Sequence, residues 1–194
     1  MLASTSDKLD LSECELDSIP EELFELSNLT ALSLAGNNLS HLPSEISKLT
    51  ALERLVLAGN KLESLPDELS SMTSLQGLWI HGNHLKQLPE DWSALKKLGT
   101  LSLAGNAISR VPDSLGELHL MEDLNLAGNH IESLPESFAG LTSLRKLHVH
   151  GNSLTALPSA LGNLPQLTVR SLYDSFINHL FWAVHQLLFQ DHSQ

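Results

Sequence analysis

The sequence has one cysteine, few aromatic residues and no apolar run near its start, and each shortage excludes a class of protein. Cys14 has no second thiol to pair with, so a framework of intramolecular disulfides is excluded. The opening stretch "MLASTSDKLDLSEC" lacks the basic start and the apolar segment of a secretory signal. We therefore expect a reducing, cytoplasmic setting. The two Asn-x-Ser/Thr triplets, at Asn28 and Asn38, would matter only in a secreted protein.

Basic residues are also scarce, since 11 Lys and Arg stand against 23 Asp and Glu, for a net charge of −12. Such a chain repels phosphate backbones and anionic lipid, so we expect neither a nucleic-acid partner nor stable membrane insertion. Eight of the acidic residues lie within residues 1–30, where Lys8 is the only base. We interpret this acidic end as a solvated face, with a docking site for a basic partner as the alternative.

The sequence is rich in one repeated hexapeptide. LSLAGN occurs at residues 32–37 and again at 101–106, and near-copies begin at Leu55, Leu78, Leu124 and Leu147, always at a spacing of 23 residues. A fixed period of this length predicts a solenoid, in which each repeat buries its apolar face against its neighbours. The composition agrees, because apolar residues make up 42% of the chain and aromatic residues only 5%, as a stack of thin leucine layers requires.

Residues 29–51 illustrate one repeat. Leu32 and Leu34 are two residues apart, which is the period of a strand, whereas Ile46 and Leu49 are three apart, which is the period of a helical turn. Pro43 suits the first position of that turn. The pattern predicts seven units of strand, turn and short helical or 3₁₀ return segment, over residues 9–26, 29–49, 52–72, 75–95, 98–118, 121–141 and 144–164.

An asparagine recurs after each predicted strand. A polar column inside a leucine stack needs partners, and an amide can both donate to and accept from the buried loop backbone of adjoining repeats. We therefore predict a structural ladder formed by Cys14, Asn37, Asn60, Asn83, Asn106, Asn129 and Asn152. The glycine that precedes each asparagine, from Gly36 to Gly151, relieves the tight turn of a Cβ clash.

The consensus "LxxLxLxxNxLxxLPxxLxxLxx" resembles the leucine-rich repeat in its 23-residue form with a Leu-Pro pair, and it covers residues 9–164. This form is similar to intracellular proteins of the Ras-scaffold and Ras-suppressor type and to their plant relatives. The resemblance implies an α/β solenoid with a parallel sheet on the concave side and short helical or 3₁₀ segments on the convex side. It also implies a protein that binds other proteins and has no chemistry of its own.

Strand alternation turns the residues between the strand leucines toward the concave wall, where we predict a protein-binding surface. Trp79 is the leading candidate, because an exposed aromatic side chain can enter a partner's pocket. The alternative is a ring that lies flat on its neighbours. Trp92 shares the column of Leu69 and Phe138, so we expect it in the core. The predicted binding surface comprises Val56, Trp79, His81, Ser102, Asn125, His148 and His150.

We predict neither a metal site nor catalysis. The closest histidine pairs, His81 with His84 and His148 with His150, are half-sites in different repeats, and zinc needs three or four ligands around one point. No glycine-rich elbow or phosphate loop accompanies any Ser, His and Asp combination. We therefore expect a protein that is not an enzyme and has no cofactor.

The repeat pattern stops after Leu164. Apolar residues then recur at three and four positions in "VRSLYDSFINHLFWAVHQLLFQ", which predicts an amphipathic helix that covers the last repeat. The expected organisation is a polar segment at 1–8, a solenoid at 9–166, and a capping helix with its tail at 167–194.

The functional hypothesis is a scaffold or regulator in intracellular signalling whose partners are other proteins, such as a small GTPase or a phosphatase. The alternatives are a substrate-recognition arm for a kinase or ubiquitin-ligase domain on another chain, and a purely structural spacer. No oligomeric state follows from the pattern.

Overall fold

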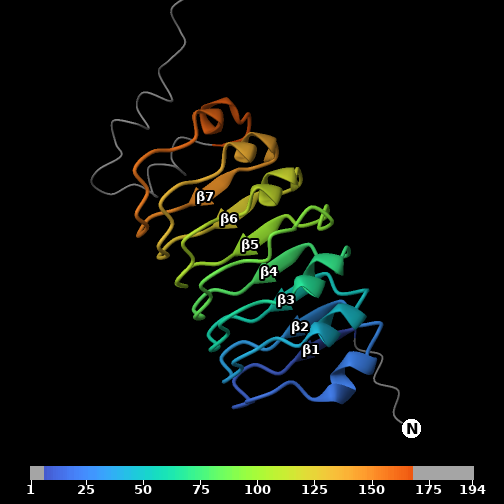
Figure 1. Cartoon of the computed structure of the whole chain (residues 1–194). Helices are drawn as coiled ribbons and strands as arrows, with labels where there is room; N and C mark the ends of the chain where they lie inside the picture. The colour runs from blue at the N-terminus through green and yellow to red at the C-terminus, as the bar shows by residue number, and fades with distance from the viewer. Residues whose placement is uncertain (1–6, 168–194) are drawn as a thin grey trace, which may run out of the picture.

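The computed structural model describes residues 7–167, which form a stack of repeats with one continuous parallel sheet (Figure 1). The sheet order is β1 to β7, so each strand pairs with its neighbours in sequence. The strands are β1 (Lys8–Asp10), β2 (Ala31–Ser33), β3 (Arg54–Val56), β4 (Gly77–Trp79), β5 (Thr100–Ser102), β6 (Asp123–Asn125) and β7 (Lys146–His148). The predicted solenoid of seven units is confirmed, and β1 begins one residue before the expected boundary.

The 23-residue period sets the strand register directly. Leu9 pairs with Leu32, and Leu32 pairs with Leu55, so the strand leucines of successive repeats lie side by side. Leu32 and Leu55 are buried, while Ser33 between two buried leucines is only partly covered. This alternation follows from the period-two geometry of a strand, and it turns one face of the sheet outward.

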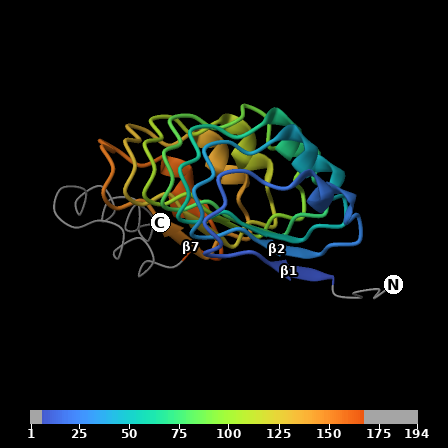
Figure 2. The same cartoon turned by 90° about the horizontal axis from the view of Figure 1, so that it is seen from below.

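The return segments are short 3₁₀ helices on the side of the stack opposite the sheet (Figure 2). Each helix directly follows a proline, which accepts the first backbone hydrogen bond; for example, Ile46 N–H donates to the Pro43 carbonyl at 3.1 Å. Pro43 therefore caps its helix rather than occupying the first helical position. The helices are η1 (Glu21–Glu25), η2 (Ser44–Lys48), η3 (Asp67–Ser71), η4 (Asp113–Glu117), η5 (Glu136–Gly140) and η6 (Ser159–Asn163).

The fourth repeat corrects the expectation that every return segment is helical, because no helix forms after Pro89. Trp92 is buried there as predicted, with 1% of its surface exposed. Its indole Nε1–H donates to the Pro89 carbonyl at 2.8 Å and so takes the acceptor that a backbone N–H uses in the other repeats. The Trp92 backbone N–H instead donates to Ser114 Oγ, at 3.0 Å, in the next repeat. The larger side chain thus replaces a helical turn by a link between repeats.

The asparagines form a ladder that points in one direction. Asn83 Oδ1 accepts from Leu62 N–H of the preceding repeat at 3.0 Å, and its Nδ2 donates to the Leu57 and Ile80 carbonyls, both at 3.0 Å. The same three-way pattern recurs at Asn37, Asn60, Asn106, Asn129 and Asn152. Each asparagine side chain therefore hydrogen-bonds to backbone groups in the loop of the repeat before it.

Cys14 is not part of this ladder, which corrects the sequence-based assignment. Its thiol is exposed and donates only to the Ser12 carbonyl of its own repeat, at 3.4 Å. The physical reason is the direction of the ladder, because no repeat precedes that of Cys14 within residues 7–167. The Cys14 loop is itself served by Asn37, whose Oδ1 accepts from Cys14 N–H at 3.0 Å.

The predicted capping helix and most of the predicted terminal segment 167–194 lie outside the described residues, as do residues 1–6.

Candidate binding surface on the sheet

The outward side of the sheet carries all seven residues predicted for binding. We call this surface the sheet face; it comprises the outward side chains of β1–β7 and the second residue after each strand, and it lies opposite the 3₁₀ helices (Figure 2). Five of the predicted residues form one row across β3–β7, in the order Val56, Trp79, Ser102, Asn125 and His148. All five are partly covered.

The two remaining predicted residues, His81 and His150, are exposed in the next row. They follow β4 and β7, so two strands, β5 and β6, lie between them. His81 Nδ1 lies 3.4 Å from Ser102 Oγ, which ties it to the row of Trp79. The structure therefore joins His81 to the centre of the sheet face and places His148 and His150 at its far end.

The Trp79 ring lies over the backbone of its own strand. Gly77 is buried beneath it, and a Cβ placed on Gly77 would lie only 2.6 Å from Trp79 Cζ3. A contact this short is not tolerated by carbon atoms, so the glycine is what allows the indole to lie down on the strand. The ring therefore contacts its neighbours, as in the second of the two expectations, and it also remains partly exposed on the sheet face.

Gly77 was missed at the level of sequence, although a signal was present. The same column holds Lys8, Ala31, Arg54, Thr100, Asp123 and Lys146, so Gly77 is the only residue without a side chain among seven strands. A glycine inside a strand marks a close approach by another group. Here that group is the aromatic ring two residues later in the same strand.

The side chains on the strands around Trp79 are mostly small and uncharged, with Arg54 as the exception. The row beyond it contains Ala35, Ala58 and Ala104, and the outward strand positions of β2 are Ala31 and Ser33. Arg54, which pairs in register with Gly77, is the one Lys or Arg among the outward positions of β2–β5. Arg54 forms no ion pair with any residue of the described range 7–167.

The far end of the sheet face differs in that some of its polar groups are already paired. Lys146 Nζ lies 3.5 Å from the Asp123 carboxylate, and Asn125 Oδ1 accepts from Ala127 N–H at 3.1 Å. Polar groups that already have partners gain little from a new one. Lys146 and the Asn125 side-chain carbonyl therefore have little to gain from a further partner.

The near end of the sheet face carries the carboxylate of Asp10. Hydrogen bonds from the Ser12 hydroxyl and from Ser12 N–H, the latter at 3.0 Å, hold the pKa of Asp10 below its usual value. The Ser12 hydroxyl also lies 2.6 Å from Ser33 Oγ on β2. Asp10 is thus a stable anion at neutral pH, held in place by its own turn.

Residues 7–167 meet neither the requirements of a metal site nor those of a membrane-spanning helix. No group of three His, Cys, Asp or Glu in this range could hold a metal ion. The same part of the chain also contains no helix long and apolar enough to cross a membrane.

A parallel sheet of 23-residue units, 3₁₀ return segments and an inward asparagine ladder together define a leucine-rich repeat solenoid. The sequence matches the family described as "Leucine-rich repeat region" over residues 8–103 and 81–180. The chain therefore belongs to the leucine-rich repeat family. A comparison with curated proteins found no match.

Several solved structures share this fold. A leucine-rich repeat protein of Leptospira interrogans is 29% identical with a TM-score of 0.61, over 82% of this chain and 53% of that one. The ectodomain of the Arabidopsis thaliana receptor kinase GASSHO1/SCHENGEN3, in complex with CASPARIAN STRIP INTEGRITY FACTOR 2, is 33% identical with a TM-score of 0.71 over 77% of this chain. The plant peptide hormone receptor RGFR1, in complex with RGF2, is 26% identical with a TM-score of 0.66 over 77% of this chain.

The matched region is short relative to the receptors. It spans 19% of the GASSHO1/SCHENGEN3 chain and 25% of the RGFR1 chain. Leucine-rich repeat regions mediate binding of proteins and peptides, and both receptor structures contain such a ligand.

Proposed function

We propose that this chain is a non-catalytic protein-interaction module, acting as a scaffold or regulator in cytoplasmic signalling and binding its partner through the centre of the sheet face. The observation that carries the proposal is the Trp79 ring, which lies partly exposed on Gly77 among mostly small side chains, with Arg54 beside it. Aromatic side chains in such surroundings are the usual centres of binding energy at protein interfaces.

The surface around Trp79 is suited to recognition because it is already ordered. The ring rests on a rigid strand, so a partner does not have to immobilise it, and binding loses little side-chain entropy. The neighbouring alanines let a partner's backbone approach the sheet closely. Arg54 supplies the one cation that could orient an acidic group on the partner.

The finer assignment follows the repeat type. The 23-residue unit with its Leu-Pro pair resembles intracellular Ras-scaffold and Ras-suppressor proteins and their plant relatives, which favours a signalling role. The receptor ectodomains that share the fold make an extended peptide a second reasonable kind of ligand for the same surface.

The test is affinity capture with the whole chain as bait, followed by calorimetry on each captured protein. The bait is compared with Trp79→Ala and with a matched control, Glu68→Ala, which changes an exposed side chain on η3 away from the sheet face. We expect a captured partner to bind Trp79→Ala about thirtyfold more weakly, and Glu68→Ala as tightly as the unchanged chain.

The identity of the captured proteins separates the alternatives. Small GTPases or phosphatases support the scaffold, whereas subunits of a kinase or ubiquitin ligase support a substrate-recognition arm. Partners that bind Trp79→Ala and the unchanged chain equally well would refute binding through the sheet face.

A further inference from the structure

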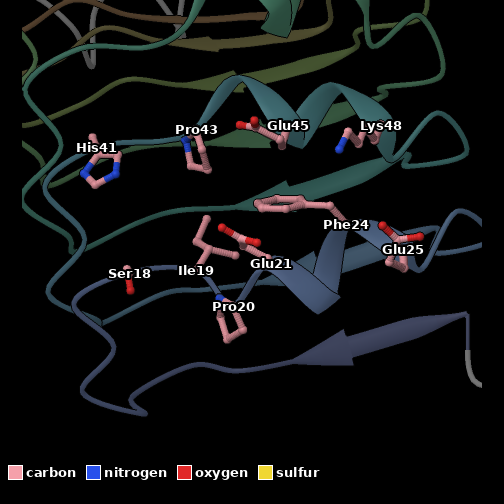
Figure 3. Close-up of a pocket in the computed structure, with 10 residues that line it drawn as sticks. All are labelled: Ser18, Ile19, Pro20, Glu21, Phe24, Glu25, His41, Pro43, Glu45 and Lys48. Carbon is pink, nitrogen blue, oxygen red and sulfur yellow. The ribbon is translucent and has the colours of Figure 1, made fainter.

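A second candidate surface lies on the helical side of the stack, between the first two repeats (Figure 3). It is an open groove of about 560 Å³ between η1 and η2. Ile19 and Phe24 form its apolar floor, and both are more than nine-tenths buried. The carboxylates of Glu21, Glu25 and Glu45 lie around it. A volume of this size accommodates a small ligand or a few side chains of a peptide.

The groove exists because of one residue in an unusual column. In the other repeats the position of Phe24 holds a small residue, and the column reads Ser47, Ser70, Ser93, Gly116, Ala139 and Gly162. Small residues let neighbouring return segments approach closely: a Cβ on Gly116 would collide with the Ser137 backbone and lie 2.7 Å from the Ser137 Cβ.

Phe24 places a phenyl ring between two neighbouring return segments, at a position where the other repeats have a small residue. The ring extends from η1 into the space beneath η2, where it lines the groove together with Pro43 (Figure 3). We infer that the ring separates η1 from η2, because two turns cannot approach as closely as η4 and η5 do with an aromatic ring between them. The apolar floor and the open space therefore have the same cause.

Within residues 7–167, none of the charged groups around the groove forms an ion pair. The ion pairs within residues 7–167 involve Glu90, Glu117, Glu122 and Asp123, and none involves a carboxylate of the groove. Lys48 at the end of η2 is the one Lys or Arg in the lining, and it also forms no ion pair in this range. The groove is thus net negative.

The charge of the first repeat extends this field beyond the groove. Residues 1–30 contain eight acidic side chains and one basic side chain, a net charge of −7, whereas the whole chain has −12. More than half of the excess negative charge therefore lies in residues 1–30, and Glu21, Glu22 and Glu25 carry part of it on η1. A field of this kind draws a cationic ligand toward the groove and repels an anionic one.

We propose that the groove is a docking site for a basic linear peptide, one that places an apolar side chain against Phe24 and Ile19 and flanking Lys or Arg residues near the three glutamates. This site is separate from the sheet face, which lies on the opposite side of the stack (Figure 2). The chain then has two independent binding surfaces and can hold two partners at once.

The test uses a fluorescein-labelled peptide of sequence GKRLRKG and fluorescence anisotropy on the whole chain at low ionic strength. We expect saturable binding that weakens as salt is added, because ionic screening acts on exposed charges. A peptide with serine in place of the leucine should bind about tenfold more weakly, since it loses the contact with the apolar floor. A peptide with glutamate in place of every Lys and Arg should not bind.

Two changes in the chain act in opposite directions on this affinity. The double variant Glu21→Gln/Glu45→Gln should weaken peptide binding about tenfold, whereas Lys48→Glu should strengthen it about threefold. All three positions are exposed, so folding is unaffected. Phe24→Ser, which restores the residue type of the column, should remove binding while leaving every carboxylate in place.

Trp79→Ala is the control for the other surface and should bind the peptide as the unchanged chain does. The proposal is overturned if the unchanged chain does not bind GKRLRKG, or if the double variant Glu21→Gln/Glu45→Gln binds this peptide as tightly as the unchanged chain. It is also overturned if Trp79→Ala lowers the affinity for the peptide as much as the double variant does. If Phe24→Ser does not fold, the charge variants still decide.

Discussion

Replacing Asn83 by alanine removes one link of the asparagine ladder, and the hydrogen bonds around it allow the cost to be estimated. The two carbonyls to which Asn83 Nδ2 donates each accept a hydrogen bond from a second asparagine as well, and they keep it in Asn83→Ala. Leu57 O also accepts from Asn60 Nδ2, and Ile80 O also accepts from Asn106 Nδ2, both at 3.1 Å. Neither carbonyl is left without a partner, so their share of the loss is small.

The main cost of Asn83→Ala falls on Leu62 N–H. This group donates to Asn83 Oδ1 at 3.0 Å, and Leu62 is fully buried, so water cannot replace the lost acceptor. A buried donor without an acceptor costs about 1–3 kcal/mol. We therefore expect Asn83→Ala to lower the free energy of unfolding by roughly 2 kcal/mol. Asn106→Ala should cost a similar amount, because Leu85 N–H loses the same contact.

Cys14→Ala is the matched control for the ladder, since the Cys14 thiol lies in the same column but contacts only Ser12 of its own repeat. It should change the free energy of unfolding by less than about 0.5 kcal/mol. Urea denaturation measures all three variants, and hydrogen exchange of the Leu62 amide reports the local effect of Asn83→Ala. Equal stability of Asn83→Ala and Cys14→Ala, with unchanged exchange at Leu62, would refute the reasoning.

Three further changes test other parts of the stack. Gly77→Ala should force the Trp79 ring off the strand and destabilise the chain by about 1 kcal/mol, which urea denaturation and the NMR signal of the Trp79 indole N–H measure; an unmoved signal contradicts the packing. Glu13→Gly should stabilise the chain by roughly 0.5–1 kcal/mol in the same denaturation assay, because Glu13 has a φ of 56° that glycine adopts without strain. Ser12→Ala should raise the pKa of Asp10 back toward its usual value, as measured by NMR titration. Since the folded pKa is lowered, the Asp10 contribution to stability is present at neutral pH and is lost as the pH falls below about 4.

The repeat and its register could be predicted from sequence because both depend on the period alone. Once leucines recur every 23 residues, Leu32 must pair with Leu55, and strand alternation must turn Ser33 outward. The same logic placed Trp79 on the sheet face and Trp92 in the core. These conclusions needed no knowledge of the volume of any side chain.

The features that could not be predicted depend on volume and direction. Trp92 shares a column with leucines, but only the structure shows its indole N–H taking the Pro89 carbonyl and preventing a 3₁₀ turn. Cys14 shares a column with asparagines, but only the structure shows that its thiol contacts its own repeat alone. Phe24 interrupts a column of small residues, and the groove that results depends on how closely neighbouring turns pack.

The direction of the ladder bears on how such a chain can lengthen in evolution. Each asparagine completes the loop before it, and each loop depends on the asparagine that follows it. A duplicated segment of 23 residues therefore adds one new loop and one new asparagine, wherever in the stack the segment begins. Every older loop keeps an asparagine to hydrogen-bond with. A duplication whose length is not a multiple of 23 residues shifts the asparagines away from the loops they serve. Tandem duplication of whole units is thus the route of growth that the hydrogen bonds permit, which agrees with the identity of the LSLAGN copies at residues 32–37 and 101–106.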